Sequence, residues 1–85
     1  MSRTPDRLVY MANQIATAFR HQGPEKAAAA TCDHLQRFWD PRMRRLIVEH
    51  LVGGGEGLGD IARRAVERLA ADLRPASGEI GLDAG

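Results

Sequence analysis

The sequence predicts an all-α protein: a small bundle of three to four short amphipathic helices with a flexible C-terminal tail. Apolar residues recur at three- and four-residue spacing in four segments, which is the pattern of one helix face, and no segment alternates as a strand does. Prolines and glycines separate these segments. A chain of 85 residues holds one domain at most, which we place at residues 4–74, with residues 75–85 as the tail.

The first two helices are each expected to start near a proline. Thr4 is a favoured N-cap residue and Pro5 suits the first helical position. The apolar stripe that follows consists of Leu8, Met11, Ala12, Ile15 and Phe19. Gly23 is expected to end this helix and Pro24 to begin the next. The second stripe consists of Ala28, Thr31, Cys32, Leu35 and either Phe38 or Trp39.

The third and fourth helices are predicted on either side of a glycine-rich connector. Asp40 is expected to be the N-cap of the third helix, with Pro41 as its first residue. Its stripe consists of Met43, Leu46, Ile47, His50 and Leu51. The connector GGGEGLG at residues 53–59 is expected to be flexible, and Asp60 to be the N-cap of the fourth helix. The apolar stripe of that helix consists of Ile61, Ala62, Ala65, Val66, Leu69 and Leu73.

Many of the apolar residues are alanines, so the core should be thin, and the monomer should be marginally stable or should lean on a partner. We expect the first three helices to form the bundle. The chain is too short for a barrel or a two-lobed nucleotide fold. No apolar run reaches the length of a membrane span, and no secretory signal is visible. With Cys32 as its single cysteine, the protein is predicted to be cytoplasmic.

No pattern of catalytic or metal-binding residues emerges, so we predict neither a metal nor a cofactor in this chain. Cys32 and His34 are two residues apart and would point to different sides of a helix, and neither a second cysteine nor a His-x3-His pair occurs in the sequence. Cys32 also lies in an apolar stripe, as a small buried residue would. Residues 57–62 match the glycine pattern of dinucleotide sites, but no strand precedes them.

The segment HLQRFWDPRMRR carries the residue types that dominate protein interfaces, arginine and tryptophan. Several of its arginines start the third helix, where the helix dipole disfavours cations, which indicates an external contact. A solvated face with Glu49 as a local partner is an equally good interpretation. The predicted partner-binding residues are Tyr10, Arg37, Phe38, Trp39, Asp40, Pro41, Arg42, Met43, Arg44 and Arg45. The alternative is a small DNA-binding or regulatory module, which the net charge of +1 disfavours.

Three segments within residues 4–69 resemble the delta subunit of cytoplasmic, NAD-dependent, molybdenum-containing formate dehydrogenases: RLVYMANQI, FWDPRMR and GGEGL. The resemblance implies a non-catalytic accessory subunit that supports assembly or stability of the complex of alpha, beta and gamma subunits, most directly through alpha. It also implies that those subunits hold molybdopterin guanine dinucleotide, iron–sulfur clusters and FMN and reduce NAD. Neither nucleic acid nor a membrane is an expected partner.

Overall fold

The computed structural model describes residues 4–73, which form four α-helices and one short 3-10 helix. The helices are α1 (Thr4–Phe19), η1 (Arg20–Gln22), α2 (Pro24–Phe38), α3 (Pro41–Val52) and α4 (Asp60–Leu73). No strand occurs within these described residues, so the all-α prediction is confirmed. The predicted tail at residues 75–85 lies outside the described part of the chain. None of the helices in residues 4–73 is both long and apolar enough to cross a bilayer.

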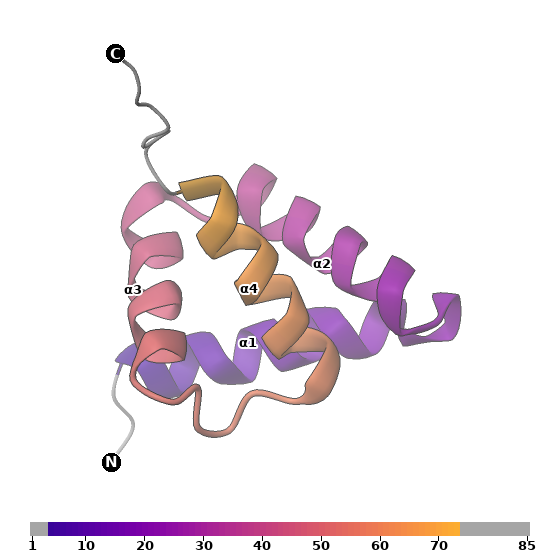
Figure 1. Ribbon diagram of the computed structural model, residues 1–85, viewed down its shortest axis with the longest axis horizontal. Helices are drawn as coiled ribbons and strands as arrows, with labels where there is room; N and C mark the ends of the chain where they lie inside the picture. The colour runs from indigo at the N-terminus through magenta and orange to yellow at the C-terminus, as the bar shows by residue number, and fades with distance from the viewer. Residues whose placement is uncertain (1–3, 74–85) are drawn as a thin grey trace.

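The fourth helix is the central element of the bundle. α4 packs most extensively against α2 and also contacts α1 and α3, as its position in Figure 1 shows. The bundle therefore includes α4, which agrees with the predicted three to four helices and adds α4 to the three helices named for the bundle. The buried face of α4 consists of Ala62, Ala65, Val66 and Leu69. Its two alanines allow close approach of neighbouring helices, and its valine and leucine fill the core.

The starts of α3 and α4 differ in how they are capped. Asp40 is the N-cap of α3 as predicted, because its Oδ1 accepts a hydrogen bond from the backbone N–H of Met43 at 2.9 Å. Asp60, predicted to cap α4, is instead the first residue of that helix. The carbonyl of Gly59 accepts the hydrogen bond from the Arg63 N–H at 2.8 Å, and the Asp60 carboxylate pairs with Arg64 Nε at 3.3 Å.

The glycine-rich connector between α3 and α4 is held against three helices, in contrast to the flexible connector that the sequence suggested. From α1, Asn13 donates through Nδ2 to the Gly57 carbonyl and accepts through Oδ1 from the Gly59 N–H, both at 2.9 Å. Gly57 has φ +89°, and a side chain there would also press on Val9 of α1. A glycine is therefore required at the point where the connector crosses α1.

Polar contacts from α3 and α4 complete the attachment of this connector. Arg63 of α4 donates through one guanidinium nitrogen to the carbonyls of Gly54 and Gly55, at 2.9 and 3.2 Å. His50 of α3 bonds through Nε2 to the Glu56 carbonyl at 2.8 Å. Since these contacts join all three helices to one loop, the connector fixes how α3 and α4 enter the bundle.

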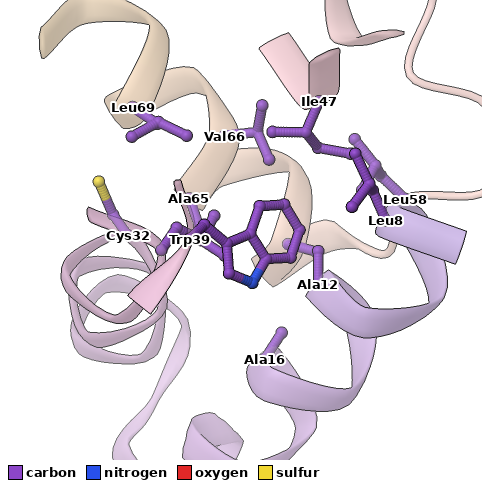
Figure 2. Packing of buried hydrophobic residues seen from close by; sticks show 12 residues of the cluster. Leu8, Ala12, Ala16, Cys32, Trp39, Ile47, Leu58, Ala65, Val66 and Leu69 are labelled. Carbon is purple, nitrogen blue, oxygen red and sulfur yellow. The ribbon is translucent and has the colours of Figure 1, made fainter. Parts of the chain in front are cut away.

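The indole of Trp39 lies in the middle of the core. Only 4 % of this residue is exposed, and Figure 2 shows its ring among Ala12 and Ala16 of α1 and Val66 of α4. Ala12 and Ala16 are buried next to this ring, and their small side chains leave room for it. Trp39 thus supplies much of the apolar volume that the alanine-rich helices lack.

Candidate functional site

An apolar groove of about 480 Å³ runs between α1 and the C-terminal half of α2 and reaches the start of α3. We refer to it as the α1–α2 groove. Most of its lining side chains are aromatic or aliphatic, with polar atoms supplied by a tyrosine, a glutamine and a histidine. The lining residues are Tyr10, Met11, Gln14, Ile15, His34, Phe38, Trp39 and Met43.

The rims of the α1–α2 groove expose large apolar side chains. Tyr10 is 64 % exposed on the α1 side and Phe38 is 70 % exposed on the α2 side, and Met11 is also exposed. Single exposed apolar residues are ordinary, but a contiguous group around a groove marks an interaction surface. Methionine suits such a surface because its flexible side chain adapts to the shape of the bound group.

The side chains of the groove are ordered by contacts within the chain. The rings of His34 and Phe38, four residues apart on α2, have centroids 4.6 Å apart, and Phe19 of α1 approaches His34 edge-on at 6.5 Å. On the opposite rim, Gln14 donates a hydrogen bond to the hydroxyl oxygen of Tyr10. A side chain that is already held in place loses less conformational entropy when a partner covers it.

The structure brings four of the predicted partner-binding residues together in this groove: Tyr10, Phe38, Trp39 and Met43. The prediction for Trp39 needs correction. Trp39 forms part of the floor, and its burial in the core leaves it without the exposed surface that an anchor for a partner requires. The neighbouring Phe38 has that surface, because consecutive residues at the end of α2 point in different directions.

Other residues of the predicted segment have contacts within the chain. Arg37 pairs through Nε with Asp33 at 2.9 Å on the exposed side of α2. Asp40 caps α3, and Pro41 is the first residue of that helix. Arg44 donates from Nη1 to the carbonyls of Gln36, at 3.0 Å, and Trp39. It therefore satisfies carbonyls at the C-terminal end of α2, where a cation is favoured by the helix dipole.

Arg42 and Arg45 are separate from these contacts. Both are exposed on α3, and Arg45 lines a different depression, formed by α3 and α4. The predicted segment thus divides between a groove, a helix cap and an outer helix face. Sequence reasoning placed these arginines in one surface because they are close in the chain.

Several groove residues were missed as site residues. Met11 and Ile15 were assigned to the core stripe of the first helix. His34 was weighed as a metal ligand and starts the segment HLQRFWDPRMRR, but it was not among the predicted partner-binding residues. Their spacing carried a signal: His34 and Phe38, like Tyr10 and Gln14, are four residues apart and so share a helix face. That spacing identifies neighbours on a helix, but only the packing of α1 against α2 shows which neighbours stay exposed.

Cys32 is a buried free thiol on α2. Burial raises the pKa of the Cys32 thiol, and the nearby Asp72 carboxylate raises it further. The protonated thiol is a weak nucleophile and a poor metal ligand. Among residues 4–73, no three His, Cys, Asp or Glu side chains come together as a metal site would require.

Comparison with known proteins identifies one family. The model of the family described as NADH-dependent formate dehydrogenase delta subunit, FdsD, matches residues 7–66 of this chain. The match includes the rims of the α1–α2 groove, the start of α3 and the glycine-rich connector. No curated protein and no solved structure matches the chain significantly.

Proposed function

Since the chain belongs to the delta-subunit family of NADH-dependent formate dehydrogenases, we propose that it is a non-catalytic accessory subunit that binds the large catalytic subunit, alpha, through the α1–α2 groove. Binding would support assembly or stability of the cofactor-loaded enzyme. The observation that carries the proposal is the row of exposed apolar side chains along that groove, above all Phe38 and Tyr10.

The groove suits a helix or an extended segment of another protein. Two helices form its walls, and amphipathic helices commonly bind in such grooves through residues spaced three and four apart. Aromatic side chains such as Tyr10 are common among the residues that dominate binding energy. The two sides of the groove would both lose exposed apolar area when covered, which favours binding by about 25 cal/mol for each Å² removed from water.

A stabilising role follows from the same contact. A partner that binds only the folded state of this chain shifts its folding equilibrium toward that state. The same contact stabilises the ordered state of the partner segment that binds. A thin, alanine-rich core makes this chain sensitive to such a contribution. In this proposal, the delta subunit and alpha each protect an apolar surface of the other.

We place the redox cofactors of the complex, namely molybdopterin guanine dinucleotide, iron–sulfur clusters, FMN and NAD, on the alpha, beta and gamma subunits. An iron–sulfur cluster is held by several thiolates, whereas this chain has Cys32 alone. A free, buried thiol is also typical of a reducing compartment, which supports a cytoplasmic complex.

The test is to purify the complex through a tag on alpha, from cells that express either the native delta chain or a variant. Phe38→Glu places a charge on the rim of the groove, so we expect the amount of delta recovered per alpha to fall by about tenfold or more. Phe38→Leu keeps an apolar side chain and should be recovered within about twofold of the native chain. Formate-dependent NAD reduction and molybdenum content of the eluate show whether loss of delta affects the enzyme.

Phe38 is largely exposed, so both variants are expected to fold, and circular dichroism of each isolated chain checks this. Full recovery of a correctly folded Phe38→Glu chain would refute the groove as the binding site. Recovery of beta or gamma through a tag on delta, from cells that lack alpha, would refute the choice of partner.

A further inference from the structure

A second exposed apolar surface lies on the outer side of α3 and the end of α4, around a depression of about 400 Å³. We refer to it as the α3–α4 face. Val52 is 82 % exposed, and Leu73 is also exposed. The lining residues are Pro41, Arg45, Val48, Glu49, Val52, Ala70 and Leu73.

This face is separate from the α1–α2 groove. At 100° per residue along a helix, Arg45 and Val52 lie about 180–200° around α3 from Met43, which lines the groove. In Figure 1, α3 forms an edge of the bundle, and within residues 4–73 it packs against α1 and α4. One partner segment in the groove would therefore leave the α3–α4 face open.

The charges at the start of α3 show what kind of partner fits. Arg42, Arg44 and Arg45 all lie in the first turns of the helix, where its dipole disfavours cations. Arg44 has an internal function, since it caps α2. Neither Arg42 nor Arg45 forms a side-chain hydrogen bond or an ion pair with another residue in the described range 4–73. Arg45 lines the face, and Arg42 lies on the same side of α3 because it precedes Glu49 by seven residues, nearly two full turns. Both present positive charge there without a counter-charge among residues 4–73.

The remaining charge on this face is Glu49, one helical turn after Arg45. Its carboxylate also has no ion pair within the described residues. From the N-terminal to the C-terminal end of α3, the face therefore runs from positive charge at Arg42 and Arg45 through Glu49 to the apolar Val52. A matching partner has its acidic residues at one end only.

We propose that the α3–α4 face binds an amphipathic helix of a neighbouring chain of the formate dehydrogenase complex, with the apolar stripe of that helix on Val48, Val52 and Leu73. Acidic residues at one end of the bound helix pair with Arg42 and Arg45. The delta subunit then contacts the complex through two opposite surfaces. The inference rests on membership in the complex and on the α3–α4 face, and it does not require that the groove binds alpha.

The first test reverses charge at the arginines. We expect the double variant Arg42→Glu, Arg45→Glu to lower the amount of delta recovered with the tagged complex by about tenfold, because each new acid meets an acid of the partner. Recovery of the native chain should also fall as salt in the wash is raised, since salt screens exposed charges. Unchanged recovery of the double variant at low salt would overturn the proposal.

Lys26→Glu is the matched control. Lys26 is exposed in the first turn of α2, as Arg42 is in the first turn of α3, and both follow a proline that begins the helix. Charge reversal at either site improves the interaction with the helix dipole, so neither should destabilise the isolated chain. Lys26→Glu should keep full recovery. An equal loss for Lys26→Glu would show a general effect of net charge and overturn the assignment to this face.

A photo-crosslinking amino acid at position 52, introduced into the assembled complex, identifies the occupant. The expected product joins position 52 to a helical segment of another subunit that has Asp or Glu near the crosslinked residue. A crosslink to a basic segment, to a second delta chain or to the same chain, or no crosslink, would overturn the proposal. The same photo-crosslinking amino acid at position 10 tests the α1–α2 groove. The two crosslinking results therefore show separately whether the proposal for each surface is wrong.

Discussion

At the scale of single residues, Asn13 connects parts of the chain that are far apart in sequence. Its amide uses both of its polar atoms, one as donor and one as acceptor, on Gly57 and Gly59 of the connector. These residues are separated from Asn13 by 44 and 46 positions. A primary amide is suited to this role because it can both donate to a carbonyl and accept from an N–H.

We predict that Asn13→Ala lowers the free energy of unfolding of the isolated chain by about 1–2 kcal/mol, because two backbone groups of the connector lose their partner. Urea titration followed by circular dichroism measures the change. Thr17→Ala, one turn later on α1, removes only a hydroxyl that bonds to the Asn13 carbonyl in the same helix, and should change stability by less than about 0.5 kcal/mol. Equal stability of Asn13→Ala and the native chain would contradict the assigned role.

At the scale of helices, α3 shows that neighbouring residues of the same type can serve different purposes. Asp40 caps its first turn, and Arg44 reaches back to carbonyls of α2, so the turn between these helices is held from both sides. Arg45, the next residue, points to the outer face. The difference arises because consecutive side chains on a helix diverge by about 100°.

This difference leads to a prediction that compares adjacent substitutions. Arg44→Ala should lower the free energy of unfolding by about 1.5–3 kcal/mol, since it removes charge-assisted hydrogen bonds to the end of α2. Arg45→Ala should leave it within about 0.5 kcal/mol, because the side chain is exposed and has no ion pair within residues 4–73. Thermal unfolding of the isolated chains distinguishes them, and a similar loss for both variants would contradict the cap.

At the scale of the whole molecule, one aromatic residue holds the bundle together while its neighbour remains available at the surface. Trp39 fills the space between helices whose facing residues are largely alanine, and Phe38 lies on the rim of the groove. The fold can therefore present apolar side chains on two opposite sides and still retain a core. If the apolar side chains of these two surfaces were part of the core, they would not be available to a partner.

Trp39→Ala and Phe38→Ala should therefore have opposite consequences. We expect Trp39→Ala to cost about 3–5 kcal/mol, enough to abolish cooperative unfolding in a domain of this size. Phe38→Ala should keep a cooperative transition within about 1 kcal/mol of the native chain and lose recovery with the complex. In the native chain, Trp39 fluorescence should shift to longer wavelength as urea unfolds the core. A stable, fully folded Trp39→Ala chain would contradict the placement of the indole.

The sequence by itself determined the helices and most of their boundaries, because these depend on interactions within about four residues: the Asp40 cap, the prolines that begin α2 and α3, and the apolar spacing of each segment. It also predicted Tyr10, Phe38 and Met43 as partner-binding residues by residue type, and these three line the groove.

Only the tertiary structure decided which of Phe38 and Trp39 is buried, which arginine caps α2, and that the connector is attached to Asn13. These outcomes depend on how helices distant in sequence approach one another. Residue type and local spacing do not contain that information, because an exposed and a buried aromatic at the end of a helix satisfy the same local pattern.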